Sequence, residues 1–165
     1  MKKGFTGSLV SRMGKRRDGH ARNVWSLGFA SFFNDVGAEM ITPLLPFYIT
    51  ALGGSGIAIG LVSGLREGLS SIFKIFGGWI SDRTGKRKAF IFLGYLISAI
   101  FKFFIGLANS WQYIIAFVSL ERFGKFRDAP RDAVISYSKK VTGRNFGIVQ
   151  MLDVVGGIIG TIIVL

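Results

Sequence analysis

The 165-residue sequence contains no cysteine, one histidine and only three prolines. Without cysteine the chain can form neither a disulfide nor a thiolate metal site, so nothing indicates its redox compartment. His20 lies in the polar stretch that opens the sequence, and the rest offers no Ser/His/Asp or Cys/His catalytic set and no His/Cys metal spacing. No phosphate-binding P-loop pattern occurs either. We expect no enzyme activity, no metal site and no cofactor.

Apolar residues are abundant: half of the chain is hydrophobic, 16 residues are Phe, and the mean hydropathy is +0.46. This composition is rare in a soluble domain with one core and typical of a membrane protein. The formal net charge of +12 is confined to three basic stretches, 1–23, 81–88 and 139–144, while the remainder has equal numbers of acids and cations. Membrane topology explains charge gathered in this way, so we expect no nucleic-acid binding.

Five apolar stretches are each long enough to cross a lipid bilayer as a helix of about 20 residues. They are 24–50, 55–80, 89–108, 111–137 and 146–165. We therefore predict an all-α membrane protein, a polytopic bundle of five transmembrane helices over 24–165 that follows a basic cytoplasmic tail, 1–23. Pro43 and Pro46 each lack a backbone donor and are expected to bend the first helix in its outer half.

The connections between these stretches alternate in charge. The N-terminal tail, 81–88 and 138–145 are basic, whereas 51–56 and 108–110 carry no charge. Because Lys and Arg are retained in cytoplasmic loops, we predict a multi-pass protein of the cytoplasmic membrane with its N-terminus inside. The apolar run from Trp25 is too long for a cleavable signal peptide and lacks a cleavage site.

Glycines recur at four-residue intervals in two of the apolar stretches. Gly60, Gly64 and Gly68 form one series, and Gly156 and Gly160 form another. Small residues at this spacing let a neighbouring helix approach closely, so the pattern predicts tight helix packing. The alternative is that apolar membrane helices are simply rich in glycine.

Ionisable side chains at membrane depth are costly and must face protein or water, which makes them candidates for function. Asp35 and Glu39 share one helical face, about one turn apart. Two such carboxylates disfavour each other's ionisation, which favours a cavity that exchanges protons or cations. Alternatively, the acids are structural partners of the cations at the same depth. The candidate cavity residues are Asp35, Glu39, Glu67, Lys74, Lys102, Arg122 and Asp153.

The basic stretch GGWISDRTGKRK (77–88) carries the most specific motif of the sequence. Its residues Gly78, Ile80, Ser81, Asp82, Arg83, Gly85, Lys86 and Arg87 closely match G-x-L-A-D-R-x-G-R-K. This pattern resembles the signature of the loop between the second and third helices of major facilitator superfamily transporters. In physical terms, Gly78 permits close helix contact, Gly85 lets the chain turn, and the cations hold the loop inside.

Three further stretches are similar to the first, fourth and fifth helices of a bacterial branch of that superfamily. They are FFNDVGAEMITPLLPFYI (32–49), ERFGKFRDAPRDAVI (121–135) and GRNFGIVQMLDVVGGIIG (143–160). The resemblance implies twelve helices in two six-helix halves, with the substrate bound between the halves near the midplane of the membrane. This chain would then supply five helices of the N-terminal half, and its partner would be the missing C-terminal half.

The resemblance also implies roles for particular residues. Asp82, Arg83 and Lys86 would belong to a charge network of the inner gate, with Asp128 or Asp132 of the fourth helix as partners. In addition, Arg122 occupies the place of an arginine that the family often links to proton coupling, and Gly156-x-x-x-Gly160 is similar to the antiporter motif.

Two departures from the family pattern stand out. Thr161 replaces the proline of the antiporter motif, so the direction of transport is not predicted. In the fourth helix relatives read GKGxRxAPRDA, whereas GKFRDAPRDA is one residue shorter. Such a shortening would turn everything after it by about 100° on a helix.

These features predict a secondary active transporter of a small molecule or ion, coupled to protons or another cation and working by alternating access. Because alternating access requires two bundles, we expect the chain to be a truncated N-terminal fragment that is inactive alone. The alternative is a small membrane protein without transport activity that regulates or packs against a larger transporter. The substrate is not predicted.

Overall fold

The computed structural model describes residues 24–136 and 142–165, and in these residues it contains helices and turns but no strand. The first helix spans 24–41. The other elements are α2 (Leu45–Ala51), α3 (Gly56–Thr84), α4 (Arg87–Gly106), α5 (Trp111–Phe123), the 3-10 helix η1 (Gly124–Arg127), α6 (Asp128–Ser136) and α7 (Thr142–Val164). The predicted all-α class is confirmed. The tail 1–23 and part of the connection 138–145 lie outside the described residues.

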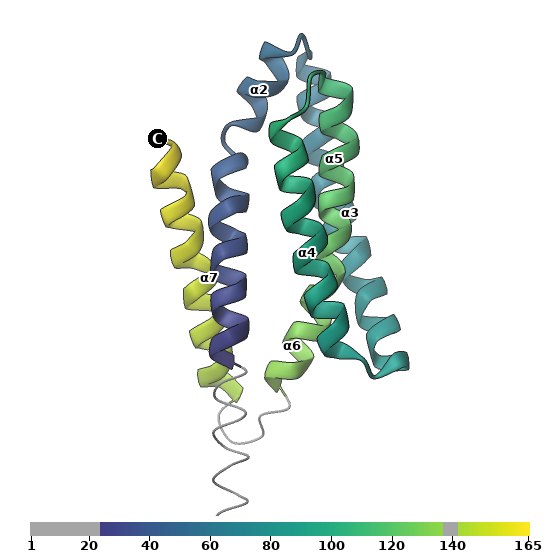
Figure 1. The fold of residues 1–165 in the computed structure, drawn as a ribbon, viewed down its shortest axis with the longest axis vertical. Coiled ribbons are helices and arrows are strands. Elements are labelled where there is room, and N and C mark those ends of the chain that lie inside the picture. Colours follow the sequence, from purple (N-terminus) through teal and green to yellow (C-terminus); the bar gives the residue numbers. More distant parts are fainter. Residues whose placement is uncertain (1–23, 137–141) are drawn as a thin grey trace, which may run out of the picture.

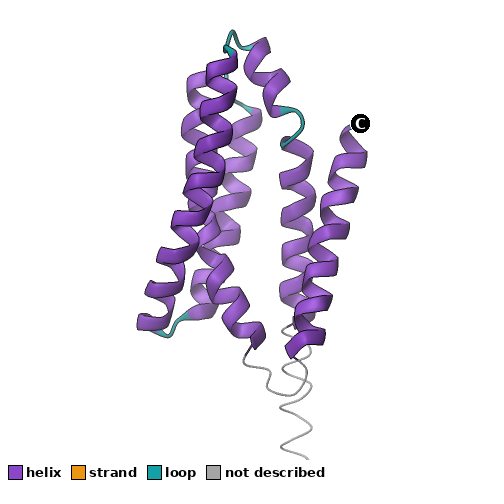
Figure 2. Ribbon diagram, turned by 180° about the vertical axis from the view of Figure 1, so that it is seen from behind, coloured by secondary structure: helices purple, strands orange, loops and turns teal. Residues whose placement is uncertain are grey.

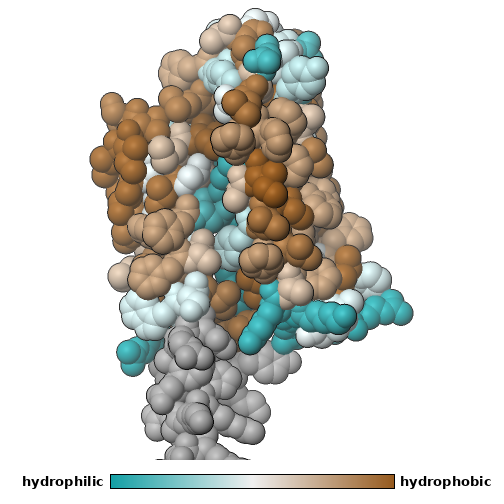
Figure 3. Space-filling model, in the orientation of Figure 1, coloured by the Kyte–Doolittle hydropathy of each residue, from teal (hydrophilic) through white to brown (hydrophobic). Residues whose placement is uncertain are grey.

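The outer surface of the helices is apolar. Among the described residues, three helices are long and apolar enough to cross a membrane, namely α3, α4 and residues Gly143–Val164 of α7. Large apolar side chains such as Phe33, Phe47 and Ile57 are largely exposed. Figure 3 shows apolar residues over most of the visible face, with hydrophilic residues gathered near the lower end of the coloured part. Such a surface suits contact with lipid, so the protein is a multi-pass membrane protein.

The first apolar stretch is helical but interrupted. A turn at 42–44 separates the first helix from α2, and Pro46 lies in the first turn of α2. A proline is tolerated there because a backbone N–H in the first turn has no partner within the helix. The predicted bend is therefore confirmed, as a break in the helix before Leu45.

The fourth stretch is continuous but changes its winding. α5 runs directly into η1 and then into α6. Each residue of a 3-10 helix turns by about 120° rather than about 100°, so the four residues of η1 add about 80° of rotation. The family pattern has one residue more, and its absence would remove about 100° of rotation. The extra rotation of η1 offsets most of this loss. A helix with the longer pattern would therefore give the side chains of α6 nearly the same orientation.

Glycines let η1 contact α3 and α4 backbone to backbone. A Cβ atom added to Gly77 of α3 would lie 2.6 Å from the carbonyl carbon of Phe126 and closer still to its oxygen. A Cβ added to Gly94 of α4 would lie 2.7 Å from the Gly124 carbonyl oxygen. Because no larger residue fits at these positions without a shift, glycine fixes the place of η1 between the two helices.

The helices form two groups (Figures 1 and 2). The first helix lies beside α7, and α3, α4 and α5 pack together on the other side, with α2 near the upper end. One apolar core joins α2 to α3, α4 and α5 through residues such as Ile49, Val62 and Ile114. A smaller core joins the first helix, α6 and α7 through Val24, Ile135 and Val149.

The two predicted glycine series behave differently. A Cβ added to Gly156 would lie 2.7 Å from the Phe32 carbonyl oxygen, and one added to Gly160 would lie 3.1 Å from the Val36 carbonyl carbon. This series therefore faces the backbone of the first helix. By contrast, Cβ atoms added to the α3 series would meet no atom of the described chain within 4 Å, and these glycines are exposed. The α3 glycines are Gly60, Gly64 and Gly68.

Candidate functional site

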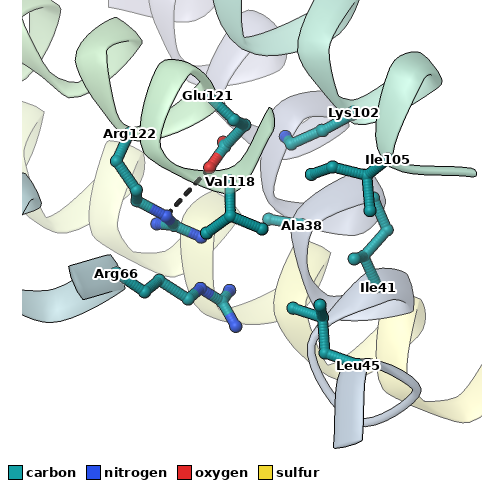
Figure 4. A pocket seen from close by; sticks show the side chains of 9 residues that line it. All are labelled: Ala38, Ile41, Leu45, Arg66, Lys102, Ile105, Val118, Glu121 and Arg122. Atoms are coloured by element: carbon teal, nitrogen blue, oxygen red, sulfur yellow. Dashed lines mark ion pairs between the residues drawn. The ribbon is translucent and has the colours of Figure 1, made fainter. Parts of the chain in front are cut away.

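A small cavity lies where the first helix, α2, α3, α4 and α5 meet. Its lining consists of Ala38, Ile41, Leu45, Arg66, Lys102, Ile105, Val118, Glu121 and Arg122. Figure 4 shows the charged side chains of Arg66, Lys102, Glu121 and Arg122 reaching into this space from three different helices. Two of these residues, Lys102 and Arg122, belong to the predicted cavity set. The lining therefore holds three cations and one carboxylate.

The carboxylate and one of the cations form a buried pair on α5. The Glu121 Oε2 atom lies 2.8 Å from the Arg122 Nε atom, and both residues are buried. The second oxygen of Glu121 accepts a hydrogen bond of 2.7 Å from the Ser98 hydroxyl of α4. Because buried charges are tolerated when they are paired and hydrogen-bonded, this pair is neutralised within the cavity wall.

The other two cations are held by neutral oxygens. Lys102 Nζ donates to the backbone oxygen of Asn34 at 2.5 Å and to its Oδ1 atom at 2.7 Å. Arg66 Nη2 donates to the Thr42 hydroxyl. Within the described ranges, no carboxylate oxygen lies within 4.0 Å of either cation. Their positive charge is thus not neutralised by direct contact.

A second charged cluster joins α6 to the first helix and α7. The Arg131 Nη1 atom donates to the Ser31 hydroxyl at 2.6 Å and to Asp153 Oδ2 at 3.2 Å. Its Nε atom lies 3.4 Å from Asp132, which in turn lies 4.0 Å from Lys74 of α3. Arg131 therefore links three elements through charge-assisted bonds, which are the stronger class of hydrogen bond.

The predicted carboxylate pair on the first helix has no ion-pair partner among the described residues. Asp35 accepts a hydrogen bond of 3.2 Å from the Asn34 side chain, and Glu39 lies against Gly157 of α7. Both are half-buried, and in the part of the chain that the structure describes neither lies within 4.0 Å of a cation. Glu67 of α3 is exposed. The alternative that the acids are structural partners of cations therefore fits Glu121 and Asp153 but not Asp35 and Glu39.

The basic loop turns as its motif suggests. Gly85 follows α3 with a φ of 68°, and its N–H donates to the Ser81 carbonyl at 2.9 Å. A left-handed glycine of this kind commonly ends a helix, because other residues are strained in this conformation. Asp82 accepts a hydrogen bond of 2.7 Å from Arg87, and the Arg83 guanidinium lies over the ring of Trp79.

The expected gate pairing differs from the observed one. Asp128 lies 3.8 Å from both Lys125 Nζ and Arg127 Nε, and Asp132 pairs with Arg131 and Lys74. Ion pairs between these acids and the predicted loop partners, Arg83 and Lys86, are not among those of the described residues. The reason is that each acid has a nearer cation on η1, α6 or α3, while Asp82 pairs within its own loop.

Several neighbours of the candidate site were not singled out from the sequence. Arg127 is buried, stacks over the Tyr95 ring at 4.3 Å, and donates to the carbonyls of Gly94 and Gly124. Arg131 links three elements, and Asn34 and Ser98 hold charged partners. The repeat RDAPRDA hinted at these arginines, because two Arg-Asp pairs four residues apart share one helical face. No pattern marked Asn34 or Ser98.

The fold and the buried charges agree with the comparisons with known proteins. The model of the Major Facilitator Superfamily matches residues 27–165. The chain belongs to this family. It is 50% identical over 143 residues to an uncharacterized MFS-type transporter of Methanocaldococcus jannaschii, an alignment that covers 86% of this chain and 36% of that protein.

Two other relatives are more distant. An uncharacterized protein of Mycobacterium tuberculosis is 32% identical over 164 residues, which cover 94% of this superfamily member and 39% of the relative. The multidrug resistance protein MdtH of Photorhabdus laumondii is 33% identical over 135 residues, with 78% of this chain and 33% of MdtH covered. The chain thus spans between a third and two fifths of these relatives. No solved structure matches it.

Proposed function

We propose that this chain is the N-terminal part of a secondary active transporter that moves a small solute by alternating access. One observation carries the proposal. Charged residues within the apolar stretches of this Major Facilitator Superfamily chain form bonds between its helices. Charges at this depth are rare, and they mark pathways for solutes and ions. The relatives' names, an MFS-type transporter and a multidrug resistance protein, support the same class of activity.

Polar side chains provide contacts between the two helix groups. Lys102 of α4 bonds Asn34 of the first helix, and Arg131 of α6 bonds Ser31 and Asp153. Bonds of this kind can be exchanged for bonds to a solute or to water, whereas at Gly156 and Gly160 the backbones of α7 and the first helix are in close contact. The groups are therefore suited to rearrange relative to one another while the first helix and α7 stay together.

Coupling to protons or another cation is assigned to Asp35 and Glu39. They lie one turn apart and have no ion-pair partner among the described residues, so protonation of either would not leave a buried cation unpaired. Charge changes at membrane depth can drive a switch when they alter the balance between two conformations. In the proposed orientation the N-terminus and the loop at 81–88 face the cytoplasm, and Asp82 with Arg87 lies at the inner gate.

Transport should be tested with the intact native protein in proteoliposomes that contain a pH-sensitive dye. Solutes of neutral, anionic and cationic classes are added outside under an imposed pH gradient. We expect one class to accelerate the collapse of the gradient and to accumulate inside. The 165-residue chain alone should show neither effect, because the proposed cycle needs a second bundle. Solute uptake that ignores the gradient would contradict the coupling, and uptake by the isolated chain would contradict its inactivity.

A second candidate, a regulatory or packing subunit, is favoured by one observation. The glycines Gly60, Gly64 and Gly68 are exposed, and a Cβ added to any of them would meet no described atom of a neighbour within 4 Å, so α3 presents a flat face on which another helix could pack. Specific co-purification of this chain with a separate, larger transporter would favour this function, provided that Gly64→Leu abolishes the association. Absence of any such partner would leave transport as the only proposal.

A further inference from the structure

We propose that the cavity binds an amphipathic organic anion, whose charged group lies between Arg66 and Lys102 and whose apolar body lies in the adjoining groove. The inference rests on the proposed transport function and names the class of its solute. Three features of the structure support it: the charge of the lining, the way in which the two cations are held, and the apolar cavity next to them.

The charge of the small cavity is unbalanced. Of its three cations, Arg122 is already paired with Glu121, and that pair is buried. Arg66 and Lys102 remain, and of the described residues that line the cavity no other is acidic. Asp35, the acid bonded to Asn34, is not among the lining residues. A cationic solute would therefore meet two like charges, whereas an anion would neutralise them.

The two cations are held by groups that an anion can replace. Arg66 donates to the Thr42 hydroxyl, and its Nε atom is buried without a hydrogen-bond partner in the part of the chain that the structure describes. Among the described residues, Lys102 donates only to the oxygens of Asn34. A bond to an anion adds the attraction between opposite charges, which a bond to a neutral oxygen lacks. A carboxylate, sulfonate or phosphate group would thus bind these two cations more strongly than Thr42 and Asn34 do.

The apolar part of the site adjoins the charged part. A cavity of about 490 Å³ is lined by Ile41, Leu44, Leu45, Phe47, Tyr48, Ala51, Lys102, Ile105 and Gly106. It shares Lys102, Ile41, Leu45 and Ile105 with the small cavity. Its size falls in the range of about 300–1,000 Å³ that is usual for sites of drug-sized ligands. Lys102 lies where the apolar surface meets the charged cavity, as an amphipathic anion requires.

Binding can be measured without knowledge of the natural solute. The intact native protein is placed in phosphatidylcholine nanodiscs, and equilibrium binding of 2-naphthoate is followed by its fluorescence. Its neutral and cationic analogues, 2-naphthylmethanol and 2-naphthylmethylammonium, carry the same apolar rings. We expect 2-naphthoate to bind at least about tenfold more tightly than the alcohol, because charged hydrogen bonds are worth more than neutral ones. The ammonium compound should bind most weakly.

Variants locate the site. Lys102→Gln and Arg66→Gln should each reduce the affinity for 2-naphthoate to that for the alcohol, while Lys102→Arg, which keeps the charge, should retain the preference. Lys88→Gln is the matched control, because Lys88 is an exposed cation on the same helix, α4. Its preference should be unchanged. Equal affinities for the three compounds in the native protein, or an equal loss in Lys88→Gln, would overturn the inference.

Two further measurements distinguish a lipid headgroup from a solute at the site, and a failure of this inference from a failure of the transport proposal. If phosphatidylglycerol in the nanodiscs abolishes 2-naphthoate binding, a lipid headgroup occupies the site and the assignment to a transported solute is overturned. If phosphatidylglycerol leaves binding intact, the solute assignment is supported. Gradient-driven uptake of neutral or cationic solutes by a protein that does not prefer 2-naphthoate would overturn only this inference. In that case the transporter assignment would stand.

Discussion

The close contact between α3 and η1 leads to a sharp prediction about stability. Gly77→Ala places a methyl group 2.6 Å from the carbonyl carbon and Cα of Phe126. Favourable contacts between carbon atoms lie at about 3.5–4.0 Å, so the backbones must separate by about 1 Å. Overpacking of this kind costs about 1–3 kcal/mol. We expect the free energy of unfolding to fall by this amount relative to a matched variant.

The matched variant is Gly64→Ala, on the same helix but with nothing within 4 Å of the added Cβ. Both substitutions gain the same helix propensity, about 0.5–1 kcal/mol, so the difference between the variants isolates the contact with Phe126. Both are made in the 165-residue chain, unfolded by SDS in dodecyl maltoside micelles and followed by circular dichroism. Equal stabilities for the two variants would refute the backbone contact between α3 and η1.

The remaining predictions concern coupling, the second charge cluster and the native protein. Asp35→Asn or Glu39→Gln in the complete protein should reduce proton-linked flux while expression is unchanged. Unaltered flux in both variants would contradict the coupling role and indicate that these acids are structural. Arg131→Gln should lower stability by up to about 3–5 kcal/mol, because it leaves the mostly buried side chain of Asp153 unpaired, and the double variant with Asp153→Asn should recover part of the loss in the same SDS titration. The intact mass of the native protein should exceed twice 18.1 kDa, since the aligned residues are only 36% of the M. jannaschii relative; a native mass of 18.1 kDa would favour the regulatory alternative.

Hydropathy and charge were sufficient to predict the class of fold. The helical stretches, the break near Pro43 and the turn at Gly85 follow from local chemistry, because each depends on residues close together in the sequence. The prediction of five crossings remains open, since a turn interrupts the first stretch, a 3-10 segment changes the winding of the fourth, and three single helices of the described residues qualify by length and composition.

The partners within the site could be predicted only in part. Ion pairs depend on which helix faces which, and the sequence alone does not give that information. The gate was expected to join Asp128 or Asp132 to the basic loop, yet both acids form ion pairs with cations outside this loop. The two glycine series have the same spacing, so the sequence could not distinguish them. The glycines of α7 contact the first helix, whereas those of α3 are exposed.

The 3-10 winding of η1 has a consequence for length as well as for rotation. Four residues of 3-10 helix rise by about 8 Å, whereas five residues of α-helix rise by about 7.5 Å. A fourth segment one residue shorter than the family pattern would therefore cross the same thickness of bilayer. A gap in an alignment need not shift the ends of such a helix in the membrane when a 3-10 segment takes up the difference.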